Sequence, residues 1–275
     1  MKWTHLSAGC RQAGPALAVA VLALVLFVPV LQFGFAGFDD TSYVESNPQV
    51  RHGLSPAALR WAWITAHAGY WAPVLWMSYQ ADASLWGPDP GGFHLTNAGL
   101  HALNAGLLCW LLQRWTKSPG LAVGLALLWA VHPLRVESVA WIAERKGVLS
   151  GLFFLLCLHF YTAGGESRGW KQAAGASSLM LGMWVKPGVL LATPFVLLLL
   201  DVWPLRRFDW SGRTAGRLIR EKWAYWLPAL GFGFLAWRIT RAVDYVRVDM
   251  PPVVARLLLV PGNYLAYLRQ TAWPA

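Results

Sequence analysis

Residues 16–33 read ALAVAVLALVLFVPVLQF, an apolar run without a single charged side chain. A helix needs about 20 mostly apolar residues to cross the hydrocarbon core of a bilayer, so this run predicts a membrane-spanning helix. Lys2 and Arg11 precede it, and basic residues also precede the apolar region of a cleaved signal peptide. We favour a retained span, because cleavage would leave the later apolar segments without their first crossing.

The rest of the 275-residue chain has the same character, with 56% hydrophobic and 13% charged residues. Soluble proteins average roughly 25% charged residues, so this composition argues against a soluble domain, a disordered chain, collagen or a disulfide scaffold. Six further apolar runs follow, at His94–Leu112, Leu121–Val131, Val148–Tyr161, Ala173–Val185, Gly188–Leu200 and Trp223–Trp237. Several are shorter than the roughly 17 residues of a normal span and would need flanking residues to cross. We predict an all-α, multi-pass integral membrane protein with about seven transmembrane helices.

The basic residues orient these predicted spans. The net charge of +10 comes mainly from connections on the N-terminal side of the membrane, above all from the segment 206–222. Basic residues favour the cytoplasmic side, which places the N-terminus in the cytoplasm and the connections around Asp39 and Glu137 outside. Because the charge follows membrane topology, we expect the lipid bilayer as a partner and no nucleic acid.

The first outer loop, residues 39–92, carries its own helix signals. Ser55 followed by Pro56 is typical of a helix start, and a second helical stretch at 74–85 ends before Gly87. Both stretches are rich in aromatic residues, which gather at membrane surfaces. We therefore expect interfacial helices on the outer membrane surface, although simple anchoring without a role in an active site explains any single Trp equally well.

Asp39 and Asp40 stand just beyond the outer end of the first predicted span. A helix C-terminus disfavours carboxylates, and neighbouring like charges raise the pKa of at least one of them. Such a pair suits a general base, whereas the competing interpretation is a solvated turn with two acidic residues.

A polar stripe runs along the second predicted span, where the residues follow one another at intervals of three or four and so share one helical face. The stripe comprises His94, Asn97, His101 and Asn104. Polar groups in the membrane face the bundle interior or a cavity. Substrate binding and structural hydrogen bonding between helices are equally compatible with this pattern. Metal ligation is disfavoured, since no matching cluster of ligands accompanies the stripe.

The segment 132–146, HPLRVESVAWIAERK, joins the third and fourth predicted spans on the outside. It opens with His132, and Glu137 and Glu144 lie two helical turns apart on one face. Arg145 and Lys146 supply donors suited to a phosphate. A plain surface ion pair is the alternative, but basic residues on the side that should lack them favour a function.

Lys186 lies in the next outer turn and adds a cation, unless it merely reaches toward the headgroups. Acids, cations and aromatic residues thus gather at one membrane face. This arrangement fits a lipid-phosphate substrate whose phosphate meets Arg145, Lys146 or Lys186 while a carboxylate of the first loop deprotonates an acceptor hydroxyl.

The same motifs resemble a known family. Phe38-Asp39-Asp40, the Asn97–Asn104 stripe, Glu144-Arg145-Lys146, Lys186-Pro187 and residues 200–205 (LDVWPL) are similar to the membrane half of the transmembrane and tetratricopeptide-repeat proteins, including their bacterial relatives. The animal members are O-mannosyltransferases that act on cadherins, and the wider group belongs to the GT-C glycosyltransferases. The resemblance implies a GT-C-like membrane domain over residues 1–275 with a polyprenyl-phosphate sugar as donor. It matches Asp39-Asp40 to the acidic motif of the first loop, and places Glu137 and Arg145 near the donor phosphate.

From these inferences we expect a glycosyltransferase that moves a sugar, plausibly mannose, to a hydroxyl of a protein or glycan acceptor. Asp39 and Asp40 are the expected catalytic residues. The sequence implies no certain cofactor and leaves the need for a divalent cation open. The expected location is a bacterial inner membrane, with a cytoplasmic N-terminus and a periplasmic active site. Family members continue into helical repeats that are absent here, so we expect a truncated chain. A transporter or flippase for a lipid-linked sugar and an inactive membrane fragment are the alternatives.

Overall fold

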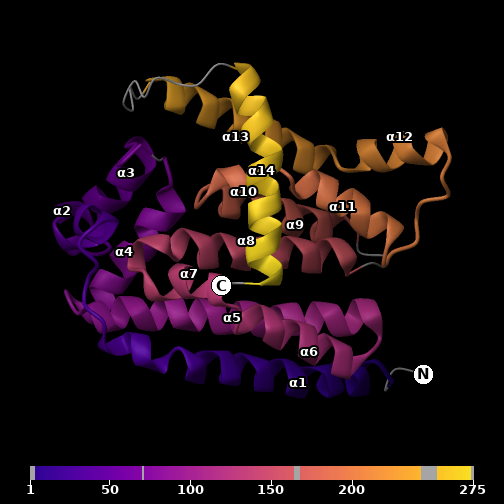
Figure 1. Cartoon of the computed structure of the whole chain (residues 1–275), viewed down its shortest axis with the longest axis horizontal. Helices are drawn as coiled ribbons and strands as arrows, with labels where there is room; N and C mark the ends of the chain where they lie inside the picture. Colours follow the sequence, from indigo (N-terminus) through magenta and orange to yellow (C-terminus); the bar gives the residue numbers. More distant parts are fainter. Residues whose placement is uncertain (1–3, 70, 164–167, 243–252, 274–275) are drawn as a thin grey trace.

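The computed structural model describes residues 4–69, 71–163, 168–242 and 253–273 (Figure 1). Within these ranges every regular element is a helix, which confirms the predicted all-α class. Helices α2, α3 and α4 gather at one end of the molecule, and α12 lies at the other end. The candidate functional residues of the first loop therefore stand far from the basic segment that contains α12.

The first two long helices are the two candidate membrane spans. Helix α1 (Thr4–Leu26) continues into a short 3-10 helix, η1 (Val28–Gln32), and packs along α5 (Pro90–Thr116). Small residues allow this close approach: a Cβ added at Gly106 would lie 3.0 Å from the carbonyl oxygen of Ala16. Residues 12–32 and α5 are both long and apolar enough to cross a membrane, as the sequence predicted for these two segments.

The third predicted span corresponds to α6 (Pro119–Ala130), and the outer segment that follows it continues as short helices after a sharp bend. Helix α6 is followed by η3 (Pro133–Arg135) and α7 (Val136–Ala140), and the chain bends by 59° at the break. Proline at 133 explains the interruption, because it removes a backbone donor and clashes with the preceding turn. Counted as one span, this bent pair raises the number of candidate crossings to three.

The remaining predicted spans are helical but do not qualify by length and composition. They correspond to α8 (Arg145–Thr162), α9 (Arg168–Met183), α10 (Pro187–Leu190), α11 (Thr193–Val202) and α13 (Trp223–Ala242). A helix rises about 1.5 Å per residue, so the shorter of these cannot cover a hydrocarbon core of about 30 Å alone. The described residues thus contain two or three candidate crossings, and the predicted count of about seven is not confirmed.

The first outer loop folds as a compact set of short helices. A π-helix, η2 (Thr41–Glu45), leads into α2 (Pro48–Arg51), α3 (Pro56–Ile64) and α4 (Pro73–Trp86). The Ser55 hydroxyl accepts a hydrogen bond from the Ala58 amide, as its predicted capping role requires. Trp76 and Tyr79 of α4 are fully buried in a core that also contains Tyr43 and Phe93, so α4 packs into the protein through these aromatic residues instead of spreading them on a membrane surface.

The opposite end of the molecule contains a buried charged cluster around Asp201. Asp201, near the end of α11, pairs with Lys222 and with the Arg207 guanidinium at 2.8 Å, and it accepts a hydrogen bond from the Tyr161 hydroxyl. Helix α12 (Gly212–Glu221) follows, and α14 (Val253–Ala272) ends the described chain. The motif at residues 200–205, quoted above for its family resemblance, thus lies at this end, away from the first loop. Its Asp201 holds neighbouring helices together.

Candidate active site

Asp40 connects the first outer loop to the segment 132–146, which we call the second outer segment. Its side chain is fully buried; one carboxylate oxygen accepts the Ala36 amide at 2.8 Å, and the other accepts the Ala143 amide at 2.7 Å. Ala143 lies in the short 3-10 helix η4 (Ile142–Glu144), directly before the charged residues 144–146. Burial raises the pKa of the Asp40 carboxyl above its ordinary value, although both amides favour the ionised form. Two segments about a hundred positions apart are thus joined by one side chain.

Asp39 lies in a different environment. It is half-buried, and its main-chain carbonyl accepts a hydrogen bond from the Ser42 hydroxyl at 3.1 Å. Within the described part of the chain, its carboxylate makes no hydrogen bond or ion pair. The two neighbouring aspartates therefore differ: Asp40 is held by two backbone amides, and Asp39 keeps its carboxylate available.

Glu144 forms ion pairs with two lysines close to Asp40. We call the turn that contains Asp39 and Asp40 the aspartate turn, and Glu144 with Lys146 and Lys186 the lysine cluster. The Lys146 ammonium lies 2.8 Å from one Glu144 carboxylate oxygen, and the Lys186 ammonium lies 3.4 Å from the other. Lys146 also lies 5.4 Å from the ring centre of Tyr43, which belongs to η2. The Lys186 side chain is 37% exposed, so this lysine reaches the surface. Through the Ala143 amide and the Glu144 ion pairs, the structure therefore connects Asp40 to the region that holds Lys146 and Lys186.

Arg145 faces the interior instead of this cluster. Its fully buried guanidinium pairs with Asp82 of α4 and donates to Asn97 Oδ1 at 2.7 Å. It also donates to the carbonyl oxygens of Ser78 and Phe93, and its guanidinium carbon lies 4.5 Å from the Tyr79 ring centre. A guanidinium surrounded in this way joins α4, α5 and α8, and we find none of its nitrogens turned toward an open surface.

The polar stripe of α5 is buried and bonds mainly to backbone carbonyls of neighbouring segments. Asn97 donates to the carbonyls of Val139 and Trp141, and Asn104 donates to Val148 at 2.7 Å. The His101 imidazole lies 2.9 Å from the Ala130 carbonyl, and His94 lies 3.4 Å from that of Gly34. The stripe thus ties α5 to α6, to the second outer segment and to α8.

Two further predicted site residues, His132 and Glu137, make no contact with the lysine cluster. His132 caps η3 by accepting the Leu134 amide, and its Nε2 lies 2.9 Å from the carbonyl of Thr271 in α14. Glu137 is exposed in the first turn of α7, and its carboxylate has no hydrogen bond or ion pair with the described residues. Neither residue contacts Asp40, Glu144 or Lys186.

Sequence reasoning missed Asp82, the buried acid that pairs with Arg145. Asp82 lies one turn after Tyr79 in α4, and Thr96 of α5 donates a hydrogen bond to it at 2.9 Å. An acid on the aromatic face of a predicted helix is the available signal, because a buried carboxylate requires a charged or hydrogen-bonding partner. The pairing itself joins positions far apart and is not visible in the spacing.

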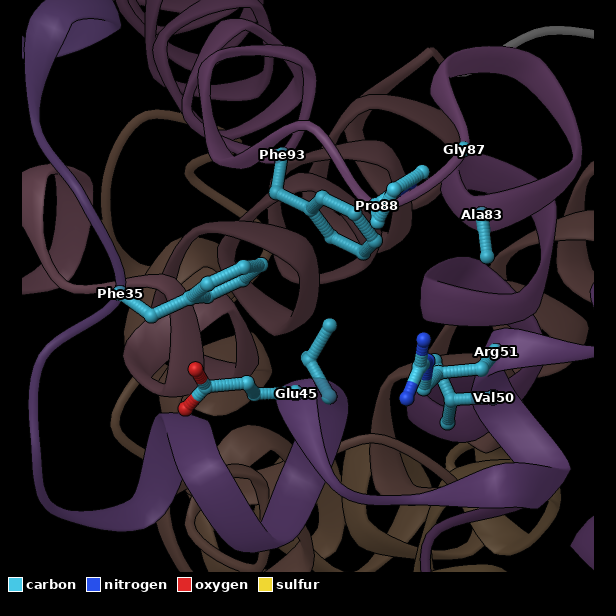
Figure 2. A pocket seen from close by; sticks show the side chains of 9 residues that line it. Phe35, Glu45, Val50, Arg51, Ala83, Gly87, Pro88 and Phe93 are labelled. Carbon is cyan, nitrogen blue, oxygen red and sulfur yellow. The ribbon is translucent and has the colours of Figure 1, made fainter.

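A cavity of about 390 Å³ lies beside η2 and α2, the helices that follow Asp40 (Figure 2). Its walls come from η2, α2, α4 and the start of α5, and include the apolar side chains of Phe35, Val44 and Phe93. Glu45 and Arg51 are its charged lining residues and lie on opposite sides of the space.

The described residues contain no group of three or more His, Cys, Asp and Glu placed to hold a metal ion.

Comparisons with known proteins give relatives whose names share one activity. The human protein O-mannosyl-transferase TMTC1 is 34% identical over 56% of this chain and 18% of its own length. The Xenopus laevis protein O-mannosyl-transferase tmtc2 is 29% identical over 61% of this chain and 21% of its own length. The mouse protein O-mannosyl-transferase TMTC4 is 24% identical over 94% of this chain and 41% of its own length.

No family model and no solved structure matches the chain. The chain spans about a fifth of the length of the first two relatives. The similarity supports a relationship to the proteins named TMTC O-mannosyl-transferases, in agreement with the resemblance of the sequence motifs.

Proposed function

We propose that this chain forms the membrane-embedded catalytic face of a glycosyltransferase. In this proposal it moves mannose from a polyprenyl-phosphate carrier to a hydroxyl of a protein or glycan at the outer membrane face. The observation that carries the proposal is the Asp40 carboxylate, which joins the aspartate turn to the segment that bears Glu144 and Lys146. The choice of mannose and of a transfer reaction follows the names of the relatives, which are protein O-mannosyl-transferases.

The two lysines held by Glu144 are the groups we assign to the donor phosphate. Lys186 is partly exposed and offers donors where the lipid head would lie, and the buried Lys146 adds positive charge behind it, next to Glu144 and η2. Ammonium groups neutralise phosphate charge as it develops on the leaving group. Arg145 we assign as a positioning residue, because its donors already bind Asp82, Asn97 and two carbonyls.

Asp39 is the residue we assign as general base. Its carboxylate is available, whereas that of Asp40 is taken up by two backbone amides. In the proposed step, Asp39 accepts the proton of the acceptor hydroxyl, and the hydroxyl oxygen forms a bond to the anomeric carbon of the sugar. The bond from that carbon to the phosphate oxygen breaks, and the phosphate leaves with the electron pair beside Lys146 and Lys186.

The remaining predicted residues support this arrangement from the protein side. We propose that the stripe from His94 to Asn104 fixes α5 against the second outer segment, so that Arg145 and Asp40 keep their positions. Glu137 and His132 flank this segment and are assigned to its approach surface, where an acceptor or headgroup passes.

The test is transfer from radiolabelled polyprenyl-phosphate mannose by the 275-residue chain in lipid nanodiscs. Asp39→Asn should abolish transfer while donor binding and expression persist. Asp209→Asn is the matched control, because it changes the same chemistry at an exposed residue beside α12. Equal turnover in Asp39→Asn and the control would remove the proposed base.

The two alternative functions give different results in the same preparation. A transporter or flippase moves labelled lipid across sealed vesicles without forming a covalent product. An inactive fragment neither transfers the sugar nor binds the labelled donor. Either result would replace the proposal.

A further inference from the structure

The cavity beside the aspartate turn has the size and lining of a small binding site. Its volume of about 390 Å³ falls within the 300–1,000 Å³ that is usual for ligand pockets. Val50 and Phe93 in its walls are almost completely buried, and Ala83 and Pro88 add further apolar surface. These apolar walls accept an apolar group.

Two opposite charges complete this lining. Glu45 and Arg51 lie on opposite sides of the cavity (Figure 2). Glu45 accepts one hydrogen bond, from the Thr41 hydroxyl at 3.0 Å, and a carboxylate has room for several more. Neither charge forms an ion pair with any residue in the described ranges. The cavity therefore offers one free acceptor and one set of free donors around an apolar space.

We infer that this cavity binds one apolar side chain of an extended polypeptide. Such a residue would place its side chain against Phe35, Ala83 and Pro88, the apolar lining residues that keep accessible surface. Its backbone N–H would meet Glu45 and a carbonyl would meet Arg51, because a peptide unit presents one donor and one acceptor. A prenyl chain has no polar groups for these charges, and a phosphate would be repelled by Glu45.

The position of the cavity links this peptide to the proposed reaction. The Ala36 amide, next to the wall residue Phe35, bonds to Asp40, and the Thr41 hydroxyl bonds to the wall residue Glu45. The other oxygen of Asp40 binds Ala143, beside the lysine cluster. On the basis of the proposed function, the cavity is thus the acceptor subsite, with the aspartate turn standing between the acceptor and the donor phosphate.

The experiment measures peptide binding without any donor, so that it does not depend on transfer. The probe is a fluorescein-labelled hexapeptide with capped ends, in which p-benzoyl-phenylalanine adjoins a threonine. It is titrated onto the 275-residue chain in nanodiscs, irradiated, and its attachment site is located by mass spectrometry. We expect attachment within residues 35–51 or 83–93.

Two variants, each with a control, test the walls and the charge. Ala83→Phe fills the cavity and should abolish attachment, whereas Leu85→Phe changes a 71% exposed position of the same helix and should leave it intact. Arg51→Gln should raise the Kd about tenfold, which corresponds to one charge-assisted hydrogen bond, and Arg60→Gln on exposed α3 should not.

The outcomes separate this inference from the proposed function. Unchanged binding in both Ala83→Phe and Arg51→Gln overturns the peptide subsite, even if mannose transfer is found. A benzophenone-labelled prenyl alcohol that attaches to the same walls and displaces the peptide also overturns it, because the occupant is then a lipid. Peptide binding that depends on these residues upholds the subsite, even if transfer fails.

Discussion

Replacement of Arg145 by methionine tests whether this residue supports the fold or binds the substrate. The change leaves Asp82 as a buried charge without its counterion, which costs about 3–5 kcal/mol when one partner of a buried pair is removed. The carbonyls of Ser78 and Phe93 lose a donor as well, at about 1–3 kcal/mol for each buried acceptor that stays unpaired. The loss is comparable to the whole stability of about 5–15 kcal/mol that is usual for folded proteins.

The protein supplies its own assay for this prediction. Cys109 and Cys157 are buried and free, so a thiol-reactive coumarin becomes fluorescent when the chain unfolds on heating. Arg145→Met should lower the midpoint by at least about 6 °C, taking 3 kcal/mol and roughly 2 °C per kcal/mol. Combination with Asp82→Asn should recover part of the loss, because the uncompensated charge is then gone.

Lys186→Met is the matched control for a cation at the surface. Its pair with Glu144 is partly exposed, and such pairs contribute about 0.2–1 kcal/mol, so the midpoint should barely move. An Arg145→Met protein that melts like the wild type but no longer binds donor would refute this reasoning, since it would make Arg145 a phosphate ligand. Equal losses in the single and double variants would also contradict the proposed pairing.

Three further predictions concern the aspartates and the lysine. Asp40→Asn should lower the melting midpoint because one of its two amide partners loses an acceptor, whereas Asp39→Asn should leave it unchanged; similar shifts in both variants would contradict the division of roles. The second prediction concerns the gap between the melting midpoints of the wild type and of Asp40→Asn. This gap should be largest near pH 4 and should become smaller as pH rises. Burial raises the folded-state pKa of Asp40, so ionisation destabilises the folded protein, and a gap that widens with pH would refute this. Lys186→Met should weaken donor binding in a titration with polyprenyl-phosphate mannose, and unchanged affinity would remove this lysine from the phosphate site.

Local signals predicted much of the fold from the sequence. The apolar runs marked the helices, and Ser55 and Gly87 marked helix ends, because capping depends on residues close in sequence. The number of crossings was less predictable. A short apolar helix in a protein core and one in a membrane have the same composition, so the apolar runs alone do not fix how many of them cross.

The site was predictable in its composition but not in its internal contacts. Aspartates beside a span and cations on the outer side drew attention to residues that the structure connects through the Asp40–Ala143 hydrogen bond and the Glu144 ion pairs. The sequence could not show that Arg145 points inward to Asp82, since a buried ion pair depends on which helices meet. Nor could it separate Asp39 from Asp40, because their difference lies in the backbone amides that only one of them reaches.

The most direct test of the central claim is chemical cross-linking between the aspartate turn and the lysine cluster. Cysteines replace Asp39 and Lys186 in a chain whose own cysteines are removed and whose α5–α6 turn, after Lys117, carries a protease site. A short, membrane-impermeant bis-thiol reagent is added outside sealed right-side-out vesicles. We expect the reagent to join the two fragments, and a pair at Asp39 and Arg213, in α12, to stay unjoined. Failure to join positions 39 and 186 although each single cysteine is labelled from outside would contradict the convergence of these motifs.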